Sequence, residues 1–299
     1  MPSSHTYIED KRNEKIKIYI NGRFYKRKDA KISVFDSSVL LGDGVWDSLR
    51  YHNQKFLFLN DHISRLYKDS KKIGLKLHFT KNDLIKLLQK TIKINKMISD
   101  VHVRLIITRG IKSTPYQDPS FTISPPSIII IPEYKKPNKK IYNKGIKLTT
   151  VKIIRGPHNV QDPRINSLSK LNCILACIEA KKKNYDEALM FDIKGNISTN
   201  NSTHFFFIKK NIVYTSRGKY CVDGITRKQI IKICKFNKIK IFEKDFSLNE
   251  ILKADEAFVT GTFANIIPVS KINLKIFNIK KTNLTFIIRN HYLNHINNL

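Results

Sequence analysis

The chain has 299 residues, of which 41% are hydrophobic and 26% charged, a composition typical of a folded protein with a substantial core. Lysine and arginine together number 55 against 24 acidic residues, so the formal net charge is +31. The excess consists mostly of dispersed lysines, which are not gathered with aromatic residues as in an RNA-binding surface. A nucleic-acid partner is therefore disfavoured despite the charge.

The sequence also limits the compartment and the metal chemistry. No apolar run reaches the roughly 18 residues that a transmembrane helix needs, and the polar start lacks the apolar segment of a secretory signal. The four cysteines form no CxxC pair and no zinc-site spacing. Cys173 and Cys177 are four residues apart on a predicted helix, so they share a face, and we expect both in the core of the protein. We predict a cytoplasmic protein with free thiols, no membrane partner and no metal.

Strand and helix signals alternate along the first half. The predicted elements are strands and turns over 15–50, helices over 61–75 and 81–95, and strands over 101–110 and 127–134. Asn21-Gly22 marks a hairpin turn, and Asp61 is a candidate N-cap. The polar stretch after this half carries two prolines and is the best linker candidate. We expect an N-terminal α/β domain over 1–134, a linker over 135–142 and a C-terminal α/β domain over 143–299.

The second half repeats the alternation. The predicted elements are a strand over 146–153, a helix over 168–184, strands over 187–192 and 203–215, a helix over 227–237, and strands over 254–263 and 266–272. The fold class is therefore α/β (α+β), with two packed layers in each domain.

Six segments resemble one family, in order and over nearly the whole chain. They are LLGDGVWDSLR (40–50), FLFLNDHISRL (56–66), VRLIITRG (103–110), DPRINSLSKLNCILACIEA (162–180), DGITRKQII (223–231) and FVTGTFANIIPV (258–269). Together they resemble the class IV, or fold-type IV, aminotransferases, which include branched-chain and D-amino-acid transaminases and aminodeoxychorismate lyase. The resemblance implies a two-domain fold with pyridoxal 5′-phosphate in the interdomain cleft, most of its site in the C-terminal domain, and a homodimer.

The residues in these segments suit a phosphate monoester, which needs a fixed cation and several backbone donors. Arg65 offers a planar guanidinium fork. Gly224-Ile225-Thr226 precedes a predicted helix, where free N–H groups favour an anion. The turn at Thr260-Gly261-Thr262 adds hydroxyl and backbone donors. The resemblance implies that the phosphate is held by Arg65, Ile225, Thr226 and Thr262, with Gly261 in the same turn.

The first departure from the family concerns the lysine that forms the Schiff base. The family run reads D-P-R-I-K-S-L-N-Y-L, whereas this chain reads DPRINSLSKL at 162–171. Asn166 therefore occupies the lysine position, and asparagine cannot form an imine. If the stretch is helical, Lys170 lies on the same face about one 5.4 Å turn away. Lys170 is thus the candidate catalytic lysine, and the alternative is a helix lysine that faces solvent or phosphate.

The second departure concerns the pyridine ring. Residues 195–200, GNISTN, stand where the family has G-x-V-T-E-G, so Thr199 replaces the glutamate that pairs with the ring nitrogen. A hydroxyl can bond to the nitrogen but cannot balance its positive charge, so we expect a neutral ring. Thr114 and Tyr116 also replace the Arg-x-His carboxylate trap of D-amino-acid transaminases, which disfavours a D-amino-acid substrate. Trp46 replaces a common phenylalanine and has either a pocket or a core role.

The leading hypothesis is pyridoxal-phosphate-dependent transamination of an amino acid or amine with a keto acid, with Lys170 as the relocated lysine. One alternative is a pyridoxal-phosphate-dependent lyase, because the ring would withdraw electrons less strongly. The other is a non-catalytic protein that binds a phosphorylated ligand, because Asn166 and Thr199 replace the usual lysine and glutamate.

Overall fold

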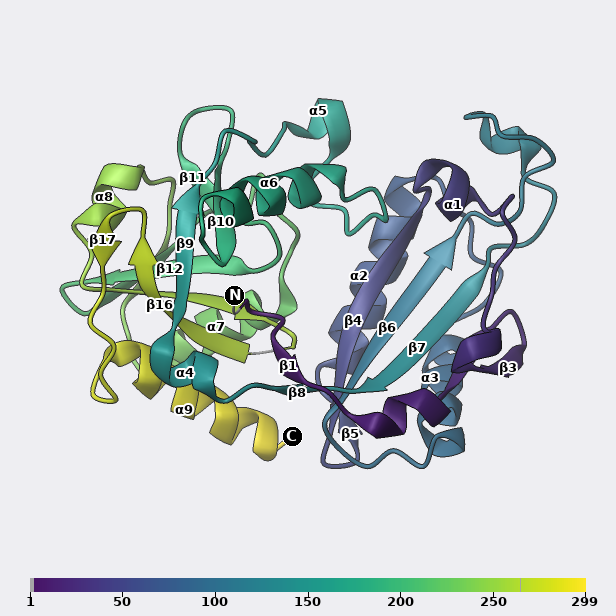
Figure 1. Ribbon diagram of the computed structural model, residues 1–299, viewed down its shortest axis with the longest axis horizontal. Coiled ribbons are helices and arrows are strands. Elements are labelled where there is room, and N and C mark those ends of the chain that lie inside the picture. The colour runs from purple at the N-terminus through teal and green to yellow at the C-terminus, as the bar shows by residue number, and fades with distance from the viewer. Residues whose placement is uncertain (1–2, 264) are drawn as a thin grey trace. The chain divides into compact units, whose positions relative to one another are not determined.

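Figure 1 shows the computed structural model, which describes residues 3–263 and 265–299. The chain forms two compact units. The N-terminal unit consists of 8–136 together with 165–170. The C-terminal unit consists of the described residues before Ile8, of 137–164 and of the chain from Leu171 onward.

The expected division at 135–142 contains the crossing from Lys136 to Pro137, but the stretch is structured. It contains strand β8 (Lys136–Pro137), which pairs with β1 (Tyr7–Ile8), and the start of helix α4 (Lys140–Lys144). The expected division also has only one boundary, whereas the segment 165–170, far along the chain, belongs to the N-terminal unit.

The N-terminal unit contains a six-stranded antiparallel sheet in the order β3-β2-β7-β6-β4-β5. Its strands are β2 (Lys17–Ile20), β3 (Arg23–Lys26), β4 (Gly44–His52), β5 (Lys55–Phe56), β6 (Val101–Thr108) and β7 (Ile128–Tyr134). Its helices are α1 (Ser37–Leu41), α2 (Leu59–Lys72) and α3 (Lys81–Ile94), with 3-10 turns η1 (Lys11–Lys15), η2 (Arg27–Asp29) and η3 (Pro119–Phe121).

The core of this unit lies between the sheet and helices α2 and α3, which Figure 1 shows side by side against the strands. Alternate residues of β6, including Val103 and Leu105, are fully buried against it, as period-2 patterning requires. The predicted hairpin is confirmed: Asn21 and Gly22 join β2 to β3 with positive φ angles of 45° and 95°.

The C-terminal unit contains a mixed nine-stranded sheet in the order β11-β10-β9-β16-β15-β12-β13-β14, with β17 paired to β16. Its strands are β9 (Ile146–Thr150), β10 (Glu187–Phe191), β11 (Ile197–Asn200), β12 (His204–Lys209), β13 (Ile212–Thr215), β14 (Ile241–Glu243), β15 (Glu256–Gly261), β16 (Asn265–Ile272) and β17 (Lys275–Ile276). Its helices are α4, α5 (His158–Gln161), α6 (Leu171–Lys182), α7 (Ile225–Phe236), α8 (Leu248–Leu252) and α9 (Leu284–Asn297).

Aromatic residues fill this sheet on both faces. Phe205 and Phe207 belong to one hydrophobic cluster, while Phe206 points the other way and stacks on Phe258 at 4.8 Å.

Within the part of the chain that the structure describes, no helix is long and apolar enough to cross a membrane.

Three helix starts differ from the prediction, and that of α7, at Ile225, is only two residues early. Asp61 is not an N-cap, because α2 begins at Leu59 after Phe58, whose left-handed conformation turns the chain. Helix α6 begins at Leu171 and not near Leu168, because the preceding residues pair with β4: Leu168 N–H donates to the carbonyl of Gly44 at 2.9 Å. The segment that carries Asn166 is therefore not helical.

The cysteines divide into two kinds. Helix α6 buries Ala176 and Ala180, so the prediction that Cys173 and Cys177 are core residues is wrong, and both are half-buried. Cys221 and Cys234 are buried. Burial raises the pKa of both buried thiols, that of Cys234 to about 12.

Thiol labelling checks this division. In the folded protein we expect a water-soluble disulfide reagent to modify two thiols quickly and the other two only after unfolding, because reaction requires an exposed thiolate. The Cys173→Ser/Cys177→Ser variant should lose the fast phase and keep the slow one. Rapid modification of Cys221 or Cys234 at full native circular dichroism would contradict the placement of these residues.

Candidate active site

A buried carboxylate orients the arginine that was expected to bind phosphate. Asp47 lies on β4, is fully buried, and accepts from Arg65 Nε at 3.0 Å and Arg65 Nη2 at 2.6 Å. His62 Nδ1 lies 2.8 Å from the same carboxylate. Burial alone would raise the pKa of Asp47, but Arg65 and His62 outweigh it and lower the pKa to about 2. Arg65 is thus held by β4 through a charge-assisted pair.

Two cationic side chains contact the ring of Trp46, the residue before Asp47. The Arg104 guanidinium carbon lies 3.7 Å from the ring centroid, and Lys170 Nζ lies 5.7 Å from it. The indole Nε1 donates to the carbonyl of Ser167 at 2.9 Å. Burial lowers the pKa of Arg104, although nearby Asp47 opposes the shift. Trp46 therefore has a structural partner in the segment 165–170.

Asn166 is built into this segment. Its backbone N–H donates to Asp69 at 3.0 Å, and its side-chain Nδ2 donates to the carbonyl of Trp46 at 2.8 Å. Only 6% of Asn166 is exposed. The helical geometry proposed for Lys170 does not hold, because residues 165–170 are not helical and α6 begins only at Leu171. What Asn166 and Lys170 share is Trp46, which both contact.

Thr199 lies on β11 and is buried. Its hydroxyl donates to the carbonyl of Thr203 at 2.8 Å, so its own proton is already used. Beside it, the buried amide of Asn200 has no hydrogen-bond partner on either atom. Arg155 donates to the Asn200 carbonyl at 3.3 Å, and within residues 3–263 and 265–299 no carboxylate pairs with this arginine. With threonine in place of the family glutamate, the buried Arg155 has no acidic partner among the described residues.

The first turn of α7 is the element that was expected to bind the phosphate. Gly224 is the N-cap, and a Cβ added to it would come within 2.3 Å of the His204 ring, so only glycine fits. The first intrahelical bond runs from Lys228 N–H to the Gly224 carbonyl at 3.0 Å. The amides of Ile225 and Thr226 in this turn therefore have no partner within the helix and suit a bound anion.

His204 also connects this turn with the other expected phosphate segment. On β12 it pairs in register with Thr260 of β15, and its Nε2 lies 2.7 Å from the carbonyl of Val222. Strand β15 ends at Gly261, and Thr262 follows in the turn. The structure thus places Gly224, at the start of α7, and Thr260, near the end of β15, beside one histidine. Thr199 adjoins the end of β15 through Thr203, whose Cγ2 lies 3.4 Å from a Cβ built on Gly261.

The predicted site residues fall into two groups. Thr199, Ile225, Thr226, Gly261 and Thr262 belong to the C-terminal unit, and Arg65 and Lys170 to the N-terminal unit. Sequence reasoning missed His204, Arg155 and Asp69. His204 had a usable signal, a single histidine at the start of an otherwise apolar strand, whereas the partners of Arg155 and Asp69 are distant along the chain.

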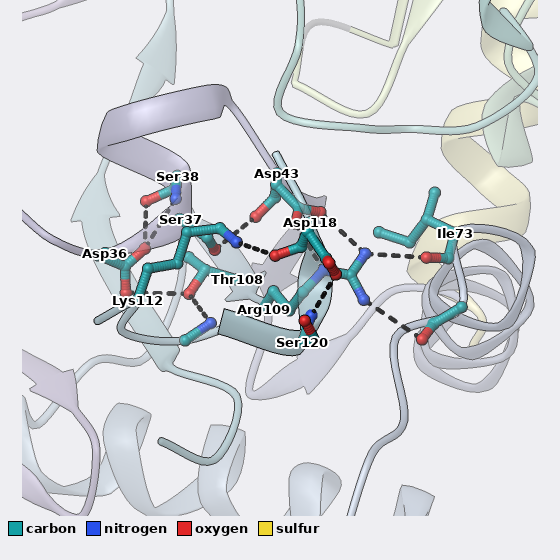
Figure 2. A network of polar contacts seen from close by, with 12 residues as sticks. Asp36, Ser37, Ser38, Asp43, Ile73, Thr108, Arg109, Lys112, Asp118 and Ser120 are labelled. Atoms are coloured by element: carbon teal, nitrogen blue, oxygen red, sulfur yellow. Dashed lines mark hydrogen bonds and ion pairs between the residues drawn. The ribbon is translucent and has the colours of Figure 1, made fainter. Parts of the chain in front are cut away.

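Two further motifs form a clamp in the N-terminal unit, shown in Figure 2. Asp43 of the GDG segment accepts from Arg109 Nε at 2.5 Å and Nη2 at 3.1 Å. Arg109 of the TRG segment also donates to the carbonyl of Ile73 at 2.9 Å, beyond the end of α2. Lys112, which is 1% exposed, donates to the carbonyl of Asp118 at 2.9 Å. This clamp ties β4, β6 and α2 together, and it leaves Thr114 and Tyr116 exposed in the adjoining loop.

Comparison with known proteins identifies the class. The amino-transferase class IV family matches residues 44–272, so the chain belongs to that family. It is 35% identical over 267 residues to a putative branched-chain-amino-acid aminotransferase of Methanocaldococcus jannaschii, covering 89% of this chain and 91% of the relative. It is 30% identical to a D-alanine aminotransferase of Staphylococcus aureus, covering 86% and 89%.

The fold agrees with this membership. A branched-chain aminotransferase of Thermoproteus uzoniensis, crystallised with norvaline, superposes with a TM-score of 0.84 at 26% identity, covering 94% of both chains. The fold-type IV prediction is confirmed. Class IV aminotransferases use pyridoxal 5′-phosphate and exchange an amino group between an amino acid and a keto acid, so this chain is an aminotransferase of that class.

The residues present fit one part of that cofactor and not another. The first turn of α7 and the Gly261-Thr262 turn suit its phosphate. The position of the covalent lysine does not suit its aldehyde, because Asn166 is buried and hydrogen-bonded there. The pyridine position offers Thr199, whose hydroxyl can accept a bond but carries no charge.

Asp47 provides a test of the N-terminal part of the site. Asp47→Asn removes the charge that Arg65 and His62 stabilise, and we expect a loss of about 2 kcal/mol at neutral pH, which follows from the pKa shift. Because the folded pKa is depressed, this contribution is present above about pH 4 and is lost as the pH falls toward 2. Urea denaturation at a series of pH values measures it.

Asp29→Asn is the matched control, since Asp29 is exposed. It should leave both the stability and its acid dependence unchanged. Equal stability of the Asp47→Asn variant and the parent protein at neutral pH would show that the buried pair contributes nothing.

Proposed function

We propose that this chain catalyses transamination with Lys170 as the lysine that holds and serves the cofactor. The observation that supports it is the shared contact with Trp46. Lys170 Nζ lies 5.7 Å from the Trp46 ring centroid, and Asn166, at the usual lysine position, bonds to the Trp46 carbonyl at 2.8 Å. The amine is thus carried on a long side chain beside the position where the family keeps it.

The other residues have separate tasks in this proposal. Bound pyridoxal phosphate supplies an electron-withdrawing ring that acidifies the substrate Cα–H. The amides of Ile225 and Thr226, with Thr262, hold the phosphate. In the N-terminal unit Asp47 orients the Arg65 guanidinium. The Lys170 amine accepts the substrate proton and returns it, which is general acid–base catalysis by a positioned side chain.

A second candidate function is the binding of a phosphorylated ligand without catalysis. The observation that favours it is Asn166, which is 6% exposed and bonded through its backbone and its side chain. This candidate keeps the first turn of α7 as an anion site and assigns no chemical role to Lys170. A lyase, the third alternative, differs from transamination in needing no keto acid acceptor.

For the substrate we propose a branched-chain or other aliphatic amino acid. The support is the 35% identical relative from Methanocaldococcus jannaschii, which is named as a putative branched-chain enzyme. The exposed Thr114 and Tyr116, in place of an Arg-x-His trap, keep a D-amino-acid substrate disfavoured as a prediction. We also propose a reducing, cytoplasmic setting, because all four cysteines are free thiols.

We further propose that the protein is a homodimer that uses helix α6. Four apolar side chains follow one another on this helix at helical spacing and are between 43% and 64% exposed: Leu171, Ile174, Leu175 and Ile178. An exposed apolar stripe of this kind marks an interaction surface. A second copy of the chain fits it, because an apolar patch matches itself in a two-fold contact.

Reduction of the purified protein with borohydride in the presence of pyridoxal phosphate tests the role of Lys170. We expect one stoichiometric adduct, on Lys170 in the peptide map, and an imine absorbance band that is absent in Lys170→Ala. Lys182→Ala, an exposed lysine of α6, is the control and should keep both the band and the turnover. Full turnover by Lys170→Ala, measured with leucine and 2-oxoglutarate, would refute the assignment.

The Asn166→Lys/Lys170→Tyr variant restores the family pattern and separates the two candidates. If the parent protein forms no imine but this variant does, the native protein is a binding protein with a retained fold. If both form one adduct, each at its own lysine, the amine has moved by four residues.

The dimer is tested by light scattering after size exclusion. Ile174→Glu/Ile178→Glu places two charges on the α6 stripe, and we expect it to convert a dimer into a monomer with native circular dichroism. Leu274→Glu is the control, because Leu274 is 89% exposed and lies outside α6. A parent protein that elutes as a monomer, or a dimer that survives both charges, would reject this interface.

A further inference from the structure

A cavity that the candidate active site does not use lies between α4 and α9 in the C-terminal unit. It measures about 400 Å³, and Lys139, Tyr142, Lys281, Phe286 and Arg289 line it. Figure 1 shows α4 directly beside the C-terminal helix α9. The volume falls in the range of about 300–1,000 Å³ that small-molecule sites occupy.

The cavity is cationic. Lys139, Lys281 and Arg289 bring three positive charges to it, and among residues 3–263 and 265–299 none of the three has an acidic partner. The acidic residue Glu256 contacts α9. Its two carboxylate oxygens accept from the N–H groups of Leu284 and Thr285 at 2.9 Å each. That carboxylate caps the helix start and is already satisfied.

Arg289 distinguishes this cavity from an ordinary basic surface. Its guanidinium carbon lies 4.0 Å from the centroid of the Tyr142 ring, so the side chain is fixed in place. Its Nε is buried and has no hydrogen-bond partner among the described residues. A buried donor left unpaired is destabilising, and a bound acceptor would satisfy it.

From these observations we propose that the α4–α9 cavity binds a small ligand with at least two oxyanion groups, phosphate or carboxylate. Arg289 presents a planar fork to one group, and the two lysines neutralise the remaining charge. Asn143 and Asn290 line the same cavity and add amide donors, while Phe286 provides an apolar wall. This site is independent of the proposed transamination, since none of its residues takes part in it.

Titration calorimetry with pyrophosphate and, in a separate arm, with citrate tests the site on the full chain at physiological ionic strength. Lys139→Gln/Lys281→Gln removes two charges at exposed positions, and we expect it to weaken binding by about tenfold or more. Lys232→Gln/Lys235→Gln, two exposed lysines of α7, is the control with the same change of charge. Tighter binding of pyrophosphate identifies a phosphate site, and tighter binding of citrate a carboxylate site.

Thr226→Ala identifies which anion site is being measured, because the first turn of α7 can also take a phosphate. Binding that persists in this variant and in the α7 control, but falls in Lys139→Gln/Lys281→Gln, supports the α4–α9 site. Equal losses in the two lysine pairs, loss in Thr226→Ala, or no binding of either probe would overturn the proposal.

Discussion

The pairing of Asp47 with Arg65 and His62 decides how the N-terminal unit is organised. A carboxylate on a central strand is removed from water, and its desolvation is offset only because two cationic or hydrogen-bonding groups reach it from α2. These contacts therefore tie α2 to strand β4. Because strand residues alternate between faces, fixing Asp47 toward α2 directs Trp46 to the opposite face, where Arg104 stacks on it. The environment of Asn166 and Lys170 follows from that arrangement.

Local patterns predicted most of the elements. The hairpin at Asn21-Gly22, helix α3 and the buried strand β7 all follow from turn chemistry or periodicity that is complete within a few residues. The errors lie where a distant contact overrides the local signal. Residues near Leu168 have a helical pattern, but hydrogen bonds to β4, more than 120 residues earlier, keep them out of helix α6. Cys173 and Cys177 on α6 were expected to be core residues and are half-buried.

The site shows the same division between local and distant information. The helix start at Gly224-Ile225-Thr226 could be recognised from sequence, because the glycine before the helix is a local signal. The substitutions at 166 and 199 were also visible, but their surroundings were not. Arg155 lies beside Asn200 without a carboxylate partner among the described residues, and only the fold brings these two segments together. A cation there disfavours a second positive charge on a bound ring.

The segment 165–170 has a further consequence, for the order in which the protein can fold. It belongs to the N-terminal unit but leaves the ribosome only after the chain has entered the second unit. During synthesis, the backbone groups of Gly44 and Trp46 therefore remain unpaired until their partners, about 120 positions downstream, have been made. Contacts of such high sequence separation slow folding and leave intermediates exposed. Neither unit corresponds to one uninterrupted stretch of gene, so a truncated first half would lack the residues that complete the surroundings of Trp46.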